Sequence, residues 1–327
     1  MTFYITLALS AFLISLLGTR FVILALRKRT VLLDIPNLRS NHRAPVPKGG
    51  GLAVVTALVI CLLVADISYD IILSLLLLTA ISLLDDLIGV PVIVRLGVQI
   101  LAVAIPLSTM SDLILPAVLP NWLDKVIIGI FWVWFINLFN FMDGIDGLSA
   151  TEMICIGIGL CLPAVLAGAF PDGLSTHSLI VVAAACGFLW WNWHPARIFL
   201  GDVGSIPIGF LLGFLLLIAI HDGYTYTALI LPGYYLGDGT ITLLRRLKKR
   251  EKIWMAHSEH YYQRAVRAGR SHESVVRYIF GINLLLILLA TLSVLHEEIA
   301  VVFVAIAYFA VFMLLGFFAH TPPTESA

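Results

Sequence analysis

Residues 299–319 read IAVVFVAIAYFAVFMLLGFFA, a stretch of 21 residues with no charged side chain. A transmembrane helix needs about 20 consecutive apolar residues, so this stretch is long enough to cross a bilayer. The rest of the chain has the same character: of its 327 residues, 60% are hydrophobic and 12% are charged, and the mean hydropathy is +1.01. Soluble domains carry roughly 25% charged residues. The sequence therefore predicts an all-α integral membrane protein.

Apolar runs of this kind follow one another along the chain and predict a single polytopic membrane domain over residues 1–327, with no room for a separate soluble domain. The four cysteines lie inside such runs without paired spacing, so we interpret them as buried apolar residues. We place about 11 spans, at 3–26, 51–65, 71–84, 92–108, 122–139, 149–169, 177–193, 205–220, 224–244, 276–295 and 299–319.

The positive charges fall on one side of this topology. An odd number of spans puts the termini on opposite sides, and Lys and Arg are enriched in cytoplasmic loops. Of 20 such residues, 18 share a side, and the turns on the other side are short and partly acidic. We therefore predict the N-terminus outside and the C-terminus in the cytoplasm. The 18 are Arg27, Lys28, Arg29, Arg39, Arg43, Lys48, Arg95, Arg197, Arg245, Arg246, Lys248, Lys249, Arg250, Lys252, Arg264, Arg267, Arg270 and Arg277.

The polar motifs fall on the same predicted face. Asp85 and Asp86 end an apolar run, where a carboxylate is costly and is usually functional. Neighbouring residues on a helix point about 100° apart, so we expect the two carboxylates to have different roles. A solvated helix end is the simpler alternative.

A second polar pattern comprises Asn137, Asn140, Asp143 and Asp146, which recur every three residues. Residues at i and i+3 share a face as long as the segment is helical. Carboxylate and amide oxygens suit Mg²⁺, which keeps some of its waters and meets phosphates. The spacing does not match a calcium EF-hand loop. A polar helix end that caps itself is the alternative.

A third motif, GDVGS at 201–205, places Asp202 where a loop enters a predicted span. The flanking glycines and the helix N-terminus favour phosphate oxygens. Asp202 would repel phosphate unless a divalent cation stood between them. The motif therefore indicates bound Mg²⁺, with a simple helix cap as the alternative.

Several further side chains are candidates for phosphate contact. His257, His260 and Arg264 would share a helix face, which favours phosphate or sugar contact over membrane-surface electrostatics or a zinc site. Lys48 and Arg95 either hold a lipid phosphate or simply extend toward the headgroups. Glu152 and Asp238 lie in apolar runs, and the sequence does not choose between a supporting role at the site and intramembrane pairing.

With these motifs in view, the chain resembles the polyprenyl-phosphate N-acetylhexosamine-1-phosphate transferases, or glycosyltransferase family 4. This family includes phospho-N-acetylmuramoyl-pentapeptide transferase and the enzymes that initiate O-antigen synthesis. The resemblance covers most of the chain and rests on four motifs in order, namely DD at 85–86, NFMDGIDG at 140–147, FLGDVGS at 199–205 and the histidine-containing loop at 257–264.

The resemblance implies a bacterial inner-membrane enzyme with an active-site cleft that faces the cytoplasm. It implies transfer of a sugar 1-phosphate from a UDP-N-acetylhexosamine to undecaprenyl phosphate, with release of UMP and with Mg²⁺, or alternatively Mn²⁺, as cofactor. We favour direct attack by the lipid phosphate over an enzyme-linked intermediate. By motif, the catalytic candidates are Asp85 and Asp86, the metal ligands Asp202, Asp143 and Asn140, and the substrate-binding residues Asn137, Asp146, His257, His260, Arg264, Lys48 and Arg95.

One motif of the chain differs from the peptidoglycan branch of this family. The peptidoglycan branch carries three consecutive histidines in its late cytoplasmic loop, whereas this chain reads His257-Ser-Glu-His260. The chain therefore resembles the surface-polysaccharide branch more closely, and we expect the loop 246–275 to contribute to the choice of sugar. Alternatives are the muramoyl-pentapeptide enzyme, a secondary transporter and a CDP-alcohol type transferase. A homodimer is expected by analogy, and no nucleic-acid partner is expected.

Overall fold

The chain folds into a bundle of long apolar helices. The computed structural model describes residues 2–27, 33–34, 45–110, 120–166, 172–252 and 257–321. The elements in these ranges are α1 (Thr2–Arg27), β1 (Leu33–Asp34), β2 (Val46–Pro47), α2 (Gly51–Val64), α3 (Tyr69–Ile88), α4 (Val92–Thr109), α5 (Asn121–Met142), α6 (Leu148–Leu166), α7 (Gly173–Asn192), α8 (Asp202–His221), α9 (Thr225–Ile230), α10 (Gly233–Lys248), α11 (Tyr261–Arg267), α12 (His272–Leu295), η1 (Glu297–Ile299) and α13 (Ala300–Ala319).

The expectation of an all-α membrane protein is confirmed. Within the described ranges, nine helices are long and apolar enough to cross a membrane, and each coincides with one of the predicted spans. The predicted span at 51–65 corresponds to the 14-residue helix α2. The only strands in those ranges, β1 and β2, form a two-residue antiparallel pair. The end of the predicted span 149–169 and part of the loop 246–275, at 253–256, lie outside the described residues.

The predicted span at 224–244 is not one continuous helix. It is divided into α9, which ends at Ile230, and α10, which begins at Gly233. Pro232 lies at the break, and proline has no N–H to donate and sterically disfavours the helix before it. Helix α10 continues past residue 244, the predicted end of the span, to Lys248. Its last turn contains basic residues.

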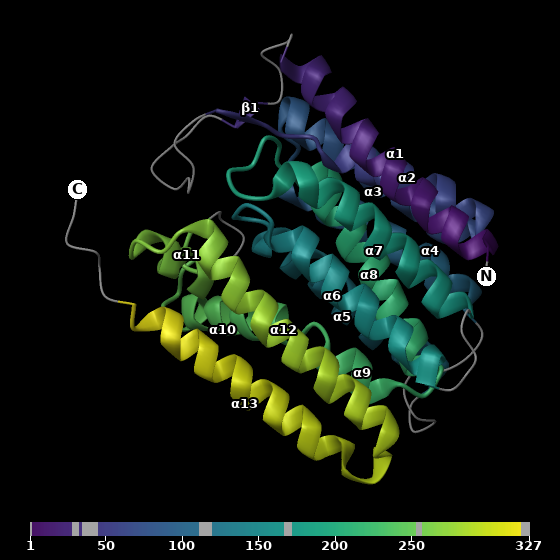
Figure 1. Ribbon diagram of the computed structural model, residues 1–327, viewed down its shortest axis with the longest axis vertical. Helices are drawn as coiled ribbons and strands as arrows, with labels where there is room; N and C mark the ends of the chain where they lie inside the picture. The colour runs from purple at the N-terminus through teal and green to yellow at the C-terminus, as the bar shows by residue number, and fades with distance from the viewer. Residues whose placement is uncertain are drawn as a thin grey trace.

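Helix α8 lies in the centre of the bundle. It packs on α2, α3, α5, α6, α7 and α9, and Figure 1 shows α1 and α2 on one flank with α12 and α13 on the opposite flank. Outward-facing apolar side chains such as Phe21, Ile130 and Phe309 are 72%, 64% and 66% exposed, as expected of surfaces in contact with lipid. The first residue of α1 and the last residue of α13 lie at opposite ends of the bundle (Figure 1).

Close packing of α5 on α8 positions the polar ends of both helices. The Trp132 ring stacks on Phe210 with centroids 4.7 Å apart, and its Nε1 donates to the Phe210 carbonyl at 2.9 Å. A Cβ on Gly213 would lie 2.7 Å from the Trp132 ring, so a side chain there would push the helices apart. The contact brings the C-terminal end of α5 against the N-terminal end of α8.

A short extended segment before α2 fixes the loop that enters α8. The Phe199 N–H donates to the Pro47 carbonyl at 2.9 Å, and the Gly50 N–H donates to the Phe199 carbonyl at 2.9 Å. The Gly51 N–H donates to the Leu200 carbonyl at 2.9 Å. These bonds place Lys48, which pairs with Phe199 in a parallel bridge, beside the GDVGS segment.

Candidate functional site

The polar cluster at this end of the bundle is centred on Asp202, the first residue of α8. Asn140, from the last turn of α5, donates through Nδ2 to Asp202 Oδ1 at 2.9 Å and to Ser205 Oγ at 2.8 Å. Arg95, from the first turn of α4, lies 3.4 Å from Asp202 Oδ2 and also pairs with Asp85. Residues from α3, α4, α5 and α8 therefore meet at one point.

The paired acids at the end of α3 have different partners, as their adjacent positions on a helix predict. Asp85 accepts from the Arg95 guanidinium and, at 2.7 Å, from the Val90 N–H. Asp86 accepts through Oδ2 from the Val203 N–H at 3.3 Å. The carboxylate of Asp85 is thus held by a cation, whereas that of Asp86 points to the first turn of α8.

The loop before α8 approaches these acids closely. Gly201 has φ of 74°, a left-handed conformation that favours glycine. A Cβ at Gly201 would lie 3.4 Å from Asp86 Oδ2 and 3.7 Å from the Cβ of Lys48. The conformation of Gly201 therefore lets the backbone of this loop approach Asp86 and the stem of Lys48 closely.

Asp143 follows the last residue of α5 and adds another carboxylate to the cluster. Its Oδ1 accepts from Ser149 Oγ at 2.7 Å. Removal from water raises the pKa of Asp143 to about 7, and the negative charges of Asp202 and Asp86 act in the same direction, while the Ser149 hydrogen bond and the Lys48 charge oppose them. Burial and the neighbouring acids thus disfavour the ionised form of Asp143.

The predicted stripe at 137–146 is split among different environments. Asn137 donates to Gln99 Oε1 of α4 at 2.7 Å, one turn below the acid cluster. Helix α5 ends at Met142, so Asp143 and Asp146 leave the shared helical face. Of the stripe, Asn140 and Asp143 face the Asp202 cluster, whereas Asp146 belongs to a neighbouring one.

Asp146 forms this second cluster with two histidines that were not among the sequence candidates. Its Oδ2 lies 2.6 Å from His194 Nδ1 and 3.0 Å from the Ala196 N–H, and its Oδ1 lies 3.1 Å from His272 Nδ1. Burial alone would raise the pKa of Asp146, but the hydrogen bonds from His272, His194 and Ala196 outweigh it, and the pKa is lowered. The three side chains lie close enough to share a metal ion, yet their distances are those of ordinary hydrogen bonds.

The histidines His257 and His260 lie together in the segment that directly precedes α11. The rings of His257 and His260 stack with centroids 4.9 Å apart, and His260 Nδ1 lies 3.2 Å from Asp238 Oδ1. Burial, the neighbouring His260 and the charge of Arg246 lower the pKa of His257 to about 4. Arg264 does not join the pair, because its guanidinium lies over the Tyr261 ring, 5.5 Å from the centroid.

Asp238, left open by the sequence, anchors the start of α11. It accepts from the N–H groups of Tyr261 at 2.9 Å and Tyr262 at 3.1 Å. The Tyr262 hydroxyl in turn donates to the Phe141 carbonyl at 3.2 Å, and a Cβ on Gly144 would lie 2.2 Å from that hydroxyl. One face of α11 therefore closes over the loop that carries Asp143.

Glu152, the other open acid, is an intramembrane partner. It is buried in α6 and accepts from Asn283 Nδ2 of α12 at 2.6 Å. The pair links two spans, which explains a carboxylate in an apolar run without a role at the site.

Sequence reasoning missed the residues that complete these clusters. His194 stands in the segment NWHPARIFLGDVGS, whose polar character was visible, but its pairing with Asp146 joins residues 48 positions apart. The missed residues are Gln99, Ser149, His194, Ser205 and His272.

The chemistry of the Asp202 cluster suits a divalent cation and a phosphate together. Among the described residues, four acids, Asp85, Asp86, Asp143 and Asp202, lie near two cations, Lys48 and Arg95. Oxygen donors with excess negative charge are the ligand set that Mg²⁺ prefers. The fold and the site together define a multi-pass helical membrane protein with an acidic cluster at one end of its spans.

Comparison with known proteins shows which family the chain is similar to. Residues 68–220 match the model of glycosyl transferase family 4. The chain is 29% identical to a probable undecaprenyl-phosphate N-acetylglucosaminyl 1-phosphate transferase of Bacillus subtilis, over 86% of this chain and 85% of the relative. It is 30% identical to the phospho-N-acetylmuramoyl-pentapeptide-transferase of Bartonella quintana, over 48% of each protein. These similarities to glycosyl transferase family 4 support the resemblance seen in the motifs of the chain.

Proposed function

We propose that the protein transfers an N-acetylhexosamine 1-phosphate from a UDP-sugar to undecaprenyl phosphate. In this reaction an oxygen of the lipid phosphate bonds to the phosphorus attached to the sugar, the bond to the bridging oxygen breaks, and UMP leaves. The observation that carries the proposal is the convergence of Asp202, Asn140, Arg95 and Asp85 at one end of the membrane helices. A soluble donor and a lipid acceptor can meet only at such a membrane surface.

The donor set assigns roles to the chain's own residues. Asp202, with Asp143 and Asn140, would hold Mg²⁺, which when bound neutralises the diphosphate and the leaving UMP. Arg95 and Lys48 supply positive charge to phosphate oxygens. Asp85 keeps Arg95 in place, while Asp86, whose Oδ2 accepts from the Val203 N–H in the first turn of α8, is the acid that we assign to the acceptor phosphate.

Direct attack fits this arrangement. A lipid phosphate is already anionic and needs little activation once its charge is screened. The residues therefore position two phosphate groups and need not form a covalent bond to either. Isolation of a phospho-sugar bound to the enzyme would contradict direct attack.

The donor sugar that we propose is N-acetylglucosamine or a 6-deoxy N-acetyl relative, used to initiate O-antigen or another surface polysaccharide. Two observations support this over the muramoyl-pentapeptide reaction. The B. subtilis relative aligns over 86% of the chain, whereas the B. quintana relative aligns over 48%. In addition, the motif His257-Ser-Glu-His260 lacks three consecutive histidines. A secondary transporter is disfavoured because transporter sites lie near the bilayer midplane, whereas this acid cluster lies at helix ends.

The test is release of UMP by the purified protein with undecaprenyl phosphate, Mg²⁺ and a panel of UDP-N-acetylhexosamines. We expect lipid-dependent and Mg²⁺-dependent release with one donor, and its loss in Asp202→Asn. Asp222→Asn, which changes an exposed acid beyond the far end of α8, is the matched control and should retain activity. Folded protein that binds no member of the panel and releases no UMP would contradict the proposal.

A further inference from the structure

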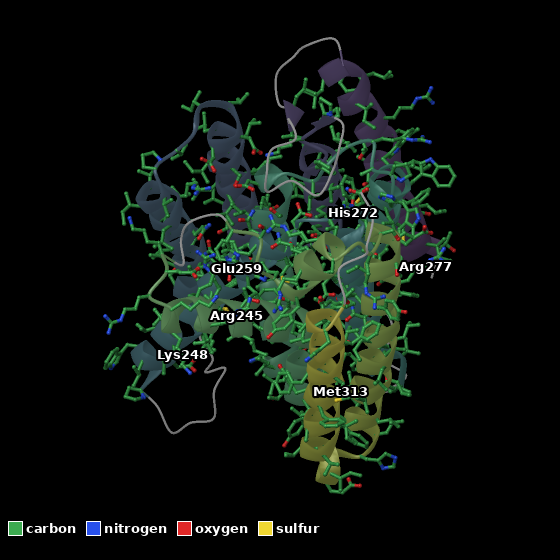
Figure 2. The ribbon with its side chains drawn as sticks, turned by 90° about the vertical axis from the view of Figure 1, so that its left-hand side faces the viewer. Arg245, Lys248, Glu259, His272, Arg277 and Met313 are labelled. Carbon is green, nitrogen blue, oxygen red and sulfur yellow. The ribbon has the colours of Figure 1, made fainter. Side chains whose placement is uncertain are left out.

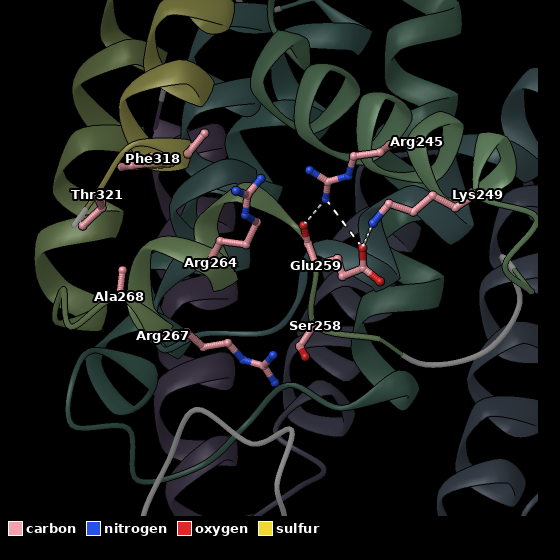
Figure 3. Close-up of a pocket in the computed structure, with 10 residues that line it drawn as sticks. Arg245, Lys249, Ser258, Glu259, Arg264, Arg267, Ala268, Phe318 and Thr321 are labelled. Carbon is pink, nitrogen blue, oxygen red and sulfur yellow. Dashed lines mark hydrogen bonds and ion pairs between the residues drawn. The ribbon is translucent and has the colours of Figure 1, made fainter. Parts of the chain in front are cut away.

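A basic pocket lies apart from the Asp202 cluster, between α10, α11 and the end of α13. Its volume is about 470 Å³, and four of its lining side chains are the cations Arg245, Lys249, Arg264 and Arg267. Figure 3 shows them around the rim, with Phe318 of α13 on one side. Among the described residues that line it, the one acid is Glu259.

The positive charge of the pocket is only partly compensated. Glu259 is shared by three cations, with Arg246 at 2.8 Å, Arg245 at 3.8 Å and Lys249 at 3.9 Å. Figure 3 shows Arg245 and Lys249 turned toward Glu259, whereas Arg264 and Arg267 are not. Within the described part of the chain, neither Arg264 nor Arg267 has a carboxylate within ion-pair distance. Two guanidinium groups are therefore available to an anion.

The shape of the rim is held by an aromatic ring. The guanidinium groups of Arg245 and Arg264 lie over the ring of Tyr261, 5.4 Å and 5.5 Å from its centroid. Cation–π contacts restrain both side chains without neutralising them. Guanidinium groups bind phosphate oxygens through paired N–H donors, so this arrangement suits a phosphate group better than a small halide.

Helix α11 borders the pocket, whose lining, in the described structure, includes no residue of the Asp202 cluster. Tyr262 and Gln263 face Gly144 in the loop that carries Asp143. Arg264 is two residues beyond Tyr262, about 200° around the helix, and Arg267 lies between Arg264 and Gln263, about 60° from the first and about 40° from the second. An anion held by Arg264 therefore lies on the face of α11 away from Tyr262, in a pocket that no residue of the Asp202 cluster lines.

The pocket lies where the apolar stretch of α13 ends. Phe318 and Ala319, the last residues of that helix, line it together with Thr321. In Figure 2, Met313 marks the apolar part of α13, at a distance from Arg245 and Glu259. Basic side chains at the end of an apolar span lie at the level of lipid headgroups and attract anionic lipid.

We propose that this pocket is a second anion site that binds a phosphate group, separate from the site of the transfer reaction. Its place at the end of α13 favours the headgroup phosphate of an anionic phospholipid over free phosphate. The inference does not depend on the proposed function, because it rests on the charges and the cavity alone.

The test is native mass spectrometry of the full-length protein with phosphatidylglycerol or phosphatidylcholine of the same acyl chains, without donor sugar. We expect selective retention of one phosphatidylglycerol and a loss of about 25-fold in affinity in the double variant Arg264→Gln/Arg267→Gln, from about fivefold per cation. Arg277→Gln is the matched control, because Arg277 is exposed, does not line the pocket, lies apart from Arg245 and Glu259 in Figure 2 and pairs with Glu273 at 2.6 Å.

Competition distinguishes the two sources of phosphate. If millimolar inorganic phosphate binds and the double variant abolishes its binding, the pocket is a phosphate site whose ligand is soluble phosphate. The proposed lipid source is then wrong, whereas the proposed phosphate site is supported. If UMP displaces the lipid, the pocket is part of the donor site and the proposal of a separate site is wrong. Equal lipid retention in wild type and double variant, or equal loss in Arg277→Gln, would also overturn it. Arg267→Gln alone, at an exposed position, serves if the double variant does not fold.

Discussion

Asp143, a proposed metal ligand, is expected to make the fold less stable when its carboxyl group is ionised. Withdrawal from water and two neighbouring acids raise its pKa to about 7, so the folded chain disfavours the ionised form that a metal ligand requires. We expect Asp143→Asn to relieve this cost and to gain about 1 kcal/mol, which corresponds to a melting temperature higher by about 2–4 °C. UMP release should be lost at the same time, because the amide supplies no charge to Mg²⁺.

Thermal unfolding in detergent and the UMP assay test this pair of outcomes. Asp222→Asn controls for the chemical change at an exposed position and should alter neither. Full activity in Asp143→Asn would remove Asp143 from the proposed metal site. A lower melting temperature would show that the carboxylate stabilises the fold.

His257 makes stability depend on pH in a defined direction. Its pKa is about 4 in the folded protein, below the ordinary value of 6.5, because burial, His260 and Arg246 disfavour its charged form. Between these two values the unfolded chain binds a proton that the folded chain does not, so stability is fully present above the upper value and falls as pH decreases through the window. We expect His257→Asn to flatten the part of this decline that His257 contributes.

Melting temperatures measured between about pH 7 and about pH 5 for both proteins check this linkage. The same slope in wild type and variant would contradict it. His296→Asn is the control, because this histidine follows the C-terminal end of α12, far along the chain from His257, and its ring is half-exposed.

At the scale of elements, the close approach of α2 to α8 fixes the first turn of α8. A Cβ on Gly51 would lie 2.2 Å from the Gly204 Cα, so a side chain must move backbone that carries Asp202. Displacements of about 1 Å at a reacting centre cost about 100-fold in rate. We therefore expect Gly51→Ala to lower UMP release by about that factor.

Gly97→Ala is the matched control for this prediction. A Cβ on Gly97, in the interior of α4, meets nothing within 4 Å among the described atoms. Alanine is the better helix former, so stability should hold or rise and activity should remain. Equal activity of Gly51→Ala and Gly97→Ala would show that the α2 contact does not position Asp202.

The helices could be predicted from the sequence because lipid imposes length and apolarity locally. The run at 299–319 and eight others became helices close to their predicted bounds. The prediction was wrong at 224–244, where Pro232 divides the span and local backbone chemistry overrides apolarity. For Asp85, Asn140 and Asp202, the sequence predicted only that they lie on the same side of the membrane. It did not predict their contacts, because these depend on the packing of α5 on α8.

At the scale of the whole molecule, the clusters that the sequence could not predict join distant segments. Asp146 and His272 are 126 positions apart, and the basic pocket combines the end of α10 with the end of α13. Periodicity does not encode such pairs. The sequence instead predicted which end of the bundle holds the chemistry, because apolar spans and Lys and Arg positions are independent signals and both place the motifs there.

The same charge distribution predicts how the molecule sits in its membrane. Lys and Arg enriched at one side mark the cytoplasmic face, and Arg277 near the start of α12 lies on that side, whereas Asp222 follows α8 at the other end. In intact cells we expect a membrane-impermeant maleimide to label Asp222→Cys, and to label Arg277→Cys only after permeabilisation. The wild-type chain, with four free cysteines, gives the background. Labelling of Arg277→Cys in intact cells, with Asp222→Cys protected, would reverse the orientation and place the Asp202 cluster outside, where a cytoplasmic nucleotide sugar could not reach it.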